Sequence, residues 1–369
     1  MTEISCVDLF CGLGGLTCGL ARGGIRVVAG IDIDAECRFP YERNNPARFV
    51  QKDVREVTAR EVQDLWPDGS ITLLAGCAPC QPFSTYSRGV RRSDDSKWET
   101  VSEFGRIVRQ ASPDLVTLEN VPQLADHRVF GEFVRSLRGY QVWYDVVSCE
   151  EYGVPQTRKR LILLASRFGP VSLDPPGGPP ATVRRAIGHL PAVTAGGRDP
   201  EDALHTASRL SRLNAQRIRA SRPGGTWRDW PPALVAECHR KPSGGTYPSV
   251  YGRMEWDAPA PTITTQCFGY GNGRFGHPEQ DRAITLREAA ILQTFPESYQ
   301  FLPDGAVVRF NVLGRLIGNA VPVRLGEAVA YSLVRHVQTR PKVSSRARRV
   351  ASPVAASVTK SQAARTSGA

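Results

Sequence analysis

The sequence predicts an α/β fold with a doubly wound, mostly parallel sheet, accompanied by a second, smaller and loop-rich domain. Two observations support this prediction. Short apolar runs alternate with amphipathic segments, a pattern that is typical of parallel sheets whose crossover connections are helices. The composition changes near Asp174: residues 174–200 are rich in proline and glycine, and the chain then stays polar and basic to about residue 282.

The elements of the first domain follow one another at short intervals. Each expected strand is a short apolar run, and each expected helix places its apolar side chains on one face. We expect strands at residues 5–10, 27–31, 49–50, 71–75, 114–118, 140–149 and 161–165. We expect helices at residues 17–22, 34–45, 101–110, 130–137, 285–293 and 323–337. A capping box of Thr285 and Glu288 should begin the helix at 285–293.

Composition narrows the class of protein. A chain of 369 residues is long enough for two domains. No apolar run approaches the ~18 residues that a membrane-spanning helix needs, and we expect no membrane association. The N-terminus has no basic-then-apolar leader. Nine scattered cysteines, an odd number, favour reduced thiols in a cytoplasm over a disulfide framework.

Positive charge is concentrated in two segments. The net charge is +11; residues 338–369 contain seven Lys or Arg and no Asp or Glu, and residues 182–260 contain twelve Lys or Arg against seven Asp or Glu. This distribution favours a polyanionic partner such as nucleic acid. The composition of residues 338–369 predicts a disordered basic tail. The tail would either help to bind a polyanion or serve only to increase the solubility of the protein.

Four candidate site features follow the ends of expected strands, where open α/β sheets place their ligands. They are a glycine-rich turn at residues 11–16, then Asp32, Cys80 and Glu119. A glycine-rich turn before a helix lets the backbone approach a nucleotide-like ligand, and Asp32 is placed to accept from ribose hydroxyls. The alternatives are a helix cap for Asp32, and for Cys80 a buried structural thiol or half of a redox pair with Cys77.

Taken in chain order, the motifs resemble those of the DNA (cytosine-5)-methyltransferases. The resemblance covers residues 5–166 and 262–337. The matching motifs are DLFCGLGG at 8–15, Pro79-Cys80-Gln81, Glu119-Asn120-Val121, Gln156-x-Arg158-x-Arg160, Arg287-Glu288 with Leu292-Gln293-x-Phe295-Pro296, and Gly318-Asn319-Ala320-Val321-Pro322. One segment departs from the family pattern of Asp-x-Arg followed by leucine, because this chain has Asp95-Ser96-Lys97 and Thr100. The departure puts a cofactor contact at Thr100 in doubt.

The resemblance implies four catalytic residues. The Cys80 thiolate would add to carbon-6 of cytosine, which makes carbon-5 able to attack a methyl sulfonium. Glu119 would contact ring nitrogen-3 and the exocyclic amine, and should be buried if it is to donate a proton. Arg160 would hold cytosine oxygen-2, and Arg158 would support the thiol loop and a phosphate. The two arginines alternate, so both should point to one face if the segment is extended.

The implied cofactor is S-adenosylmethionine as methyl donor, with no metal. Its pocket would draw on residues from the early strand ends and, late in the chain, from the last motif. The expected cofactor-binding residues are Phe10, Gly12, Leu13, Gly14, Gly15, Asp32, Ile33, Asp53, Val54, Pro79, Asn319 and Val321.

The implied substrate is double-stranded DNA, from which the target cytosine must be flipped into the pocket. Gln81, Ser84, Ser87 and Asn120 would contact it. The catalytic, S-adenosylmethionine-binding domain would comprise residues 1–178 and 305–337 and would contain a Rossmann-like class I methyltransferase sheet. Residues 179–304 would form the target-recognition domain. We further expect a monomer in the bacterial cytoplasm, associated with the nucleoid, with a cognate restriction endonuclease as a possible partner.

Three alternatives remain open on the sequence alone. The first is a tRNA cytosine-5 methyltransferase of the same family, against which the long basic insert argues. The second is a thiol redox protein that uses Cys77 and Cys80. The third is a non-catalytic DNA-binding relative, which the presence of Cys80, Glu119 and Arg160 disfavours.

Overall fold

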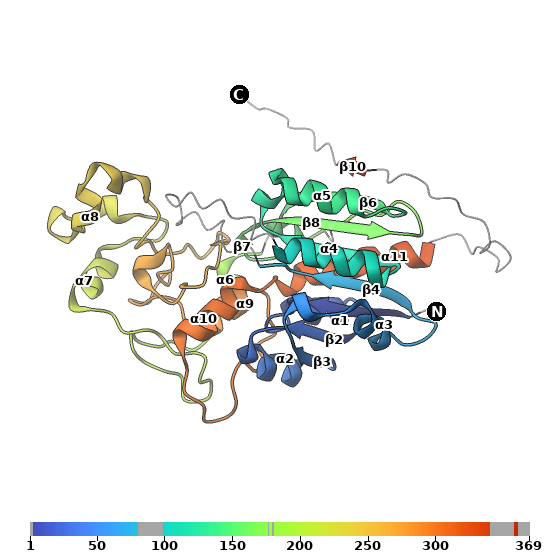
Figure 1. The fold of residues 1–369 in the computed structure, drawn as a ribbon. Coiled ribbons are helices and arrows are strands. Elements are labelled where there is room, and N and C mark those ends of the chain that lie inside the picture. The colour runs from blue at the N-terminus through green and yellow to red at the C-terminus, as the bar shows by residue number, and fades with distance from the viewer. Residues whose placement is uncertain (1–2, 80–98, 176, 179–180, 340–357, 361–369) are drawn as a thin grey trace. The chain divides into compact units, whose positions relative to one another are not determined.

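The computed structural model describes residues 3–79, 99–175, 177–178, 181–339 and 358–360 (Figure 1). The chain divides into two compact units. Unit 1 comprises Met1–Ser148, Lys159–Pro175 and Leu325–Ala369, and unit 2 comprises Cys149–Arg158 and Pro176–Arg324.

An eight-stranded sheet with the order β10-β6-β8-β5-β4-β1-β2-β3 forms the centre of unit 1 (Figure 1). Strand β8 is antiparallel to β5 and β6, and the other neighbouring strands are parallel, which confirms the mostly parallel α/β sheet. The strands are β1 (Ile4–Leu9), β2 (Arg26–Asp32), β3 (Arg48–Gln51), β4 (Ile71–Gly76), β5 (Leu115–Asn120), β6 (Gln141–Ser148), β8 (Lys159–Ser166) and β10 (Val358–Lys360).

The winding of the sheet reverses between β1 and β4. The chain runs from β1 outward through β2 and β3, and then returns to β4 on the other side of β1. Strands β1, β4 and β5 consist almost entirely of buried residues, as strands covered on both faces must. The carboxyl ends of β1 and β4 therefore flank a topological switch point, where sheets of this kind bind ligands.

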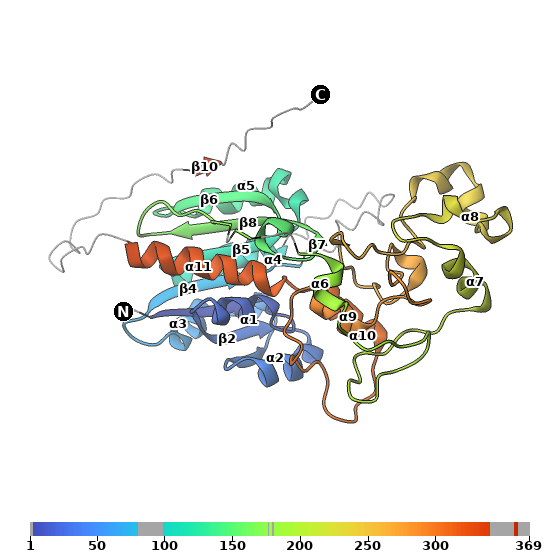
Figure 2. The same cartoon turned by 180° about the vertical axis from the view of Figure 1, so that it is seen from behind.

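Helices cover both faces of this sheet (Figures 1 and 2). Helices α4 and α5 lie on one face, and α1 and α11 lie on the other. The backbones of α1 and α11 approach closely, since a Cβ added at Gly23 would lie 2.3 Å from the Cβ of Ala330. The helices of unit 1 are α1 (Gly15–Arg22), α2 (Arg38–Asn44), α3 (Ala59–Leu65), α4 (Glu99–Ala111), α5 (Arg128–Ser136) and α11 (Val323–Thr339), of which the first two residues of α11 belong to unit 2.

The packing of α4 fixes the end of β4. Phe104 of α4 is fully buried in the main apolar cluster of unit 1. Its ring lies so close to Gly76, the last residue of β4, that an added Cβ there would come within 2.6 Å of it. Interiors of this density hold the backbone at the start of the following loop in one position.

Unit 2 is largely irregular and has a small aromatic core. The core contains Ile218, Trp227, Trp230 and Tyr270. Tyr247 lies outside this core, with 47% of its surface exposed. The regular elements are α6 (Val183–Ile187), α7 (Arg212–Ala220), α8 (Glu237–Arg240), α9 (Leu286–Leu292), α10 (Phe310–Asn319) and a two-stranded sheet of β7 (Gln156–Thr157) and β9 (Ala260–Pro261).

Short 3-10 helices connect the elements of both units. They are η1 (Ala35–Cys37), η2 (Val54–Glu56), η6 (Pro122–Asp126), η7 (Cys149–Tyr152), η8 (Trp227–Asp229), η9 (Pro232–Leu234), η10 (Pro242–Thr246) and η11 (Tyr270–Asn272).

A buried ion pair anchors α9 in unit 2. The predicted capping box of Thr285 and Glu288 is confirmed. The Glu288 carboxylate also accepts two hydrogen bonds of 2.7 Å from the fully buried Arg282. Burial by itself would raise the pKa of Glu288, but the Arg282 guanidinium holds it below its usual value. The imidazole of His277 lies 3.7 Å away, and its pKa is lowered to about 4, chiefly by burial.

The two units do not coincide with the expected domain boundaries. The expected target-recognition domain was 179–304, whereas unit 2 also includes Cys149–Arg158 and residues 305–324. These segments belong to unit 2 because β7 pairs with β9 and α10 contacts α9. The segment expected to be a disordered tail contains some regular structure, since α11 continues to Thr339 and Val358–Lys360 pair with β6 as strand β10. Val and Thr are β-branched, which suits an edge strand.

Candidate active site

The expected nucleophile loop begins directly after β4. Of its residues, Pro79 is exposed and described, whereas Cys80, Gln81, Ser84 and Ser87 lie outside the described residues. Two side chains from other elements bind the backbone just before Cys80. Asn120 Nδ2 donates to the Ala78 carbonyl at 3.0 Å, and Thr100 Oγ1 donates to the Pro79 carbonyl at 3.4 Å.

Asn120 has internal partners in the structure. It is buried at the end of β5, and its Oδ1 accepts from the backbone N–H of Val121 at 2.9 Å. Together with the bond to Ala78, this arrangement ties the end of β5 to the entry of the loop that carries Cys80. The predicted contact of Asn120 with substrate stays a prediction, since these bonds by themselves account for a positioning role.

Glu119 is held between two side chains at the end of β5. The residue is only 4% exposed. The Cys77 thiol donates to Oε2 at 2.7 Å, and Arg160 Nε lies 2.7 Å from Oε1. The second contact is an ion pair in which the N–H is poorly aligned with Oε1, so that oxygen has no well-formed hydrogen bond among the described residues. Arg160 reaches this position because β8 pairs directly with β5.

Arg158 has hydrogen-bond partners of its own. It belongs to unit 2, where it is 2% exposed. Its guanidinium donates to the carbonyls of Ile263 at 2.9 Å and Gly318 at 3.1 Å. Residue 158 precedes β8, so the two arginines do not lie within one strand, and the expectation that both point to one face stays a prediction. These bonds give Arg158 a structural role, and its predicted role toward phosphate remains untested.

The turn after β1 has the backbone conformation of a ligand-binding loop. Phe10, Gly12 and Gly14 all have positive φ, at 59°, 53° and 94°. A Cβ added at Gly12 would meet no atom within 4 Å, so there is open space beside this residue. Gly14 and Gly15 are buried at the start of α1, and Leu13 is buried as well.

Asp32 is bound to this turn. Its carboxylate accepts from the backbone N–H of Gly12 and from that of Asp34, each at 2.9 Å. Burial raises the pKa of Asp32, and these backbone bonds oppose the rise. The neighbouring Ile33 is 62% exposed. An acidic group beside open space, next to an exposed apolar side chain, fits the ribose and adenine of a nucleoside.

The other expected cofactor residues are distributed over both units. Asp53 is the N-cap residue of η2 and forms an ion pair with Arg55, which lowers the pKa of Asp53. Val54, the next residue, is buried. Asn319 is exposed and Val321 is buried, and both belong to unit 2. Their predicted contacts with a cofactor bound by unit 1 stay predictions.

Sequence reasoning did not identify Asp8 and Cys77 as parts of this site. Asp8 is fully buried in β1, where its Oδ2 accepts from Thr17 Oγ1 at 2.7 Å. The Thr17 hydroxyl is also 3.1 Å from the hydroxyl of the buried Tyr41. Burial raises the pKa of Asp8 to about 7, and the nearby charge of Asp32 adds to the rise. The available signal was an acidic residue in the middle of an otherwise apolar strand.

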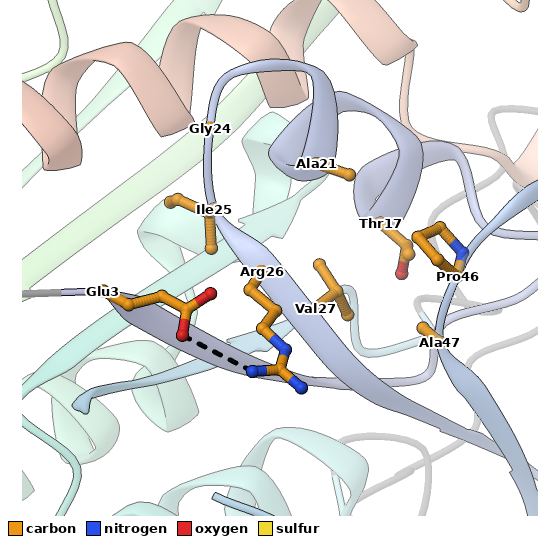
Figure 3. Close-up of a pocket in the computed structure, with 9 residues that line it drawn as sticks. All are labelled: Glu3, Thr17, Ala21, Gly24, Ile25, Arg26, Val27, Pro46 and Ala47. Atoms are coloured by element: carbon orange, nitrogen blue, oxygen red, sulfur yellow. Dashed lines mark hydrogen bonds and ion pairs between the residues drawn. The ribbon is translucent and has the colours of Figure 1, made fainter. Parts of the chain in front are cut away.

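A separate pocket lies between α1 and the start of β2 (Figure 3). Its volume is about 490 Å³, and the side chains of Glu3 and Arg26 form an ion pair at 3.4 Å on its wall. None of the expected cofactor residues is among the residues that line it. It therefore does not correspond to the candidate site.

Three further observations concern the described part of the chain. The eight cysteines placed there are all free thiols. No cluster of three or more His, Cys, Asp or Glu side chains among the described residues could hold a metal ion. Within the same residues, no helix combines the length and the apolar character needed to cross a bilayer.

Comparison with known proteins gives one consistent family. The family of C-5 cytosine-specific DNA methylases matches residues 4–335. The Type II methylase M.HgiDII of Herpetosiphon aurantiacus is 52% identical over 340 residues, which cover 90% of this chain and 95% of that protein. The Type II methyltransferase M1.BsuMI of Bacillus subtilis is 31% identical, over 90% of this chain and 81% of that protein.

A solved structure supports the fold. The crystal structure of a putative DNA modification methyltransferase encoded within a prophage of E. coli aligns with a TM-score of 0.70. It covers 91% of this chain and 100% of that one at 22% identity, a level at which the likeness concerns the fold alone. The relatives at higher identity are DNA methylases of restriction–modification type, so neither the tRNA nor the thiol redox alternative is favoured. The chain therefore belongs to the C-5 cytosine-specific DNA methylase family, whose members methylate carbon-5 of cytosine in DNA.

Proposed function

We propose that the chain acts through a covalent adduct between Cys80 and a cytosine flipped out of duplex DNA, with S-adenosylmethionine as methyl donor. The observation that carries the proposal is the placement of Glu119. This carboxyl group is buried at the end of β5, beside Arg160 and next to the backbone that leads into Cys80.

The methyl transfer requires a nucleophile and an acid that act on the same cytosine ring. Carbon-5 of cytosine attacks a methyl group poorly until a thiolate adds to carbon-6. The Cys80 sulfur forms the bond to carbon-6, and carbon-5 then takes the methyl group. Loss of the carbon-5 proton and cleavage of the sulfur–carbon bond complete the reaction. S-adenosylmethionine supplies the methyl group when it is bound.

Glu119 and Arg160 have complementary roles in this scheme. Glu119 holds a proton at ring nitrogen-3 and accepts from the exocyclic amine, so that it stabilises the ring while sulfur adds. Arg160 orients the glutamate and donates to cytosine oxygen-2. We do not propose that Arg158 contacts the cytosine, because its guanidinium donates hydrogen bonds to backbone carbonyls of unit 2.

Unit 1 supplies the cofactor side of the site. The turn from Phe10 to Gly14 would approach the methionine part, and Asp32 the ribose hydroxyls. The open space beside Gly12 and the exposure of Ile33 support this assignment. Asp53, Val54, Pro79, Asn319 and Val321 complete the proposed contacts, although Asp53 would first have to share its carboxylate with Arg55.

We infer that unit 2 reads the DNA sequence, within the segment 179–304. Its arginines fall into two groups. Arg217, Arg253 and Arg282 are buried in internal networks and serve the structure. The exposed arginines, together with the exposed Lys241, can contact phosphates or base edges; they are Arg184, Arg185, Arg198, Arg209, Arg212, Arg219, Arg222, Arg228 and Arg240.

The proposal extends to the biological setting. We propose a bacterial cytoplasmic enzyme that acts as a monomer on the host's double-stranded DNA and protects it from a cognate restriction endonuclease. The Type II names of the relatives support this setting.

The test begins with bisulfite sequencing of DNA from a host that expresses the protein, which identifies the methylated site. Purified protein is then mixed with S-adenosylmethionine and a duplex that carries 5-fluorocytosine at that site. We expect an adduct that mass spectrometry locates at Cys80, and none with Cys80→Ser. Glu119→Gln should lower turnover by about 10²-fold or more, as loss of an acid–base group does. Near-normal turnover of Glu119→Gln, or an adduct at another residue, would contradict the mechanism.

A further inference from the structure

The Cys77 side chain makes an unusual contact with the proposed acid. Its thiol donates to Glu119 Oε2 at 2.7 Å, although the two residues are 42 positions apart in the sequence. The backbone of Cys77 is itself fixed, because its N–H donates to the Leu9 carbonyl at 3.3 Å. The backbone that carries the thiol is therefore anchored to the end of β1, at the start of the loop that carries Cys80.

Glu119 needs such a contact because Arg160 alone does not fix its carboxyl plane. The last torsion of a glutamate side chain is broad, and one contact to one oxygen leaves it free to rotate. The ion pair at Oε1 is close but poorly aligned. A second contact at Oε2, from a different strand, restricts the rotation. Arg160 on β8 and Cys77 after β4 are the two ionisable side chains in contact with this carboxyl group among the described residues.

We propose that Cys77 is a positioning residue, which orients the Glu119 carboxyl group for the cytosine ring. This inference rests on the proposed function of Glu119. The choice of sulfur has a chemical reason. A thiol is a weak hydrogen-bond donor, so it restrains a carboxyl group while stabilising the carboxylate less than a hydroxyl would. A residue at this position can thus hold the acid in place and leave it able to keep a proton.

The kinetic test compares Cys77→Ala, Cys77→Ser and a matched control, Cys6→Ala, which removes a buried thiol from β1 in the same unit. We expect kcat of Cys77→Ala to fall about tenfold, the effect of one lost hydrogen bond in the reacting state. The KM values for DNA and S-adenosylmethionine should stay within about twofold, because the proposed role of the thiol is confined to Glu119. Cys6→Ala should keep its kcat.

Cys77→Ser separates a positioning role from simple packing. The serine hydroxyl should restore most of kcat, since it can donate to the same oxygen. If kcat of Cys77→Ala matches that of Cys6→Ala, or if Cys77→Ser is as slow as Cys77→Ala, the proposal is overturned.

A second readout does not depend on activity. The S–H stretching band lies in a window of the infrared spectrum where other protein groups do not absorb, and its frequency falls when the thiol donates. Subtracting the spectrum of Cys77→Ala assigns the Cys77 band. In Glu119→Gln, which offers a weaker acceptor, this band should move to higher frequency; an unchanged band would refute the contact. Should the wild-type protein fail to methylate DNA, the proposed function would fall, while the band shift would still decide whether Cys77 restrains Glu119.

Discussion

Asp8 provides the most direct test of the electrostatics beneath the candidate site. It is a fully buried carboxyl group in β1, and its pKa of about 7 results mainly from burial. Its Oδ2 accepts from Thr17, whereas Oδ1 has no hydrogen-bond partner among the described residues. We predict that Asp8→Asn changes the stability of unit 1 in a way that depends strongly on pH.

The magnitude follows from linkage between protonation and folding. An acid whose folded pKa is raised stabilises the fold below its unfolded pKa of about 3.9, and this contribution is lost as the pH rises through the folded pKa. A difference of about 3 pKa units costs the wild-type protein about 4 kcal/mol at pH 8 and about 1.5 kcal/mol at pH 5. Asparagine removes this cost but leaves an amide donor unpaired, at about 1–3 kcal/mol.

The free-energy difference between the variant and the wild type should therefore change by about 3 kcal/mol between pH 5 and pH 8. Near pH 8 the variant should be the more stable protein, and near pH 5 it should be equal or less stable. Urea unfolding at several pH values measures the difference, and hydrogen exchange of the β1 and β5 amides assigns it to unit 1. A difference that does not vary with pH would refute the assignment of a raised pKa to Asp8.

Three further predictions concern other parts of the chain. In unit 2, His277 has its pKa lowered to about 4 from an unfolded value near 6.5, so its stabilising neutral form is lost as the pH falls between these values. We expect wild-type unit 2 to lose about 3 kcal/mol over this range and His277→Gln to lack that component; parallel unfolding curves against pH would contradict this. Gly30→Ala should destabilise unit 1 by about 1–3 kcal/mol, because the new Cβ would lie 2.4 Å from the buried Tyr41 ring. Gly245→Ala is its control, since a Cβ there meets no atom within 4 Å; equal melting temperatures for the two variants would show that the ring can move aside. Removal of residues 340–369, which contain seven Lys or Arg, should flatten the dependence of DNA affinity on salt by about 0.9 in slope for each basic residue that contacts a phosphate, and an unchanged slope would exclude the tail from binding.

The order of the elements was predictable because each carries a local signal. The short apolar runs became strands at nearly the expected residues, and Thr285 with Glu288 forms the expected cap, since a capping box involves residues only three positions apart. The motif residues at the strand ends were predictable for a similar reason. Consecutive parallel strands place their carboxyl ends along one edge, so Asp32 and Glu119 could be assigned to that edge before any contact was known.

The contacts within the site depend on which strands are neighbours, and no local pattern specifies that. Glu119 meets Cys77 and Arg160 because β5 lies between β4 and an antiparallel β8. Arg158 and Arg160 alternate in sequence, yet the chain enters β8 between them, and they join different networks. The raised pKa of Asp8 likewise comes mainly from its complete burial in the folded protein. The sequence alone determined the family, the order of elements and the reacting residue types. Only the tertiary structure decided which side chains hold the acid, because hydrogen bonds and desolvation depend on distances between segments that are far apart in the chain.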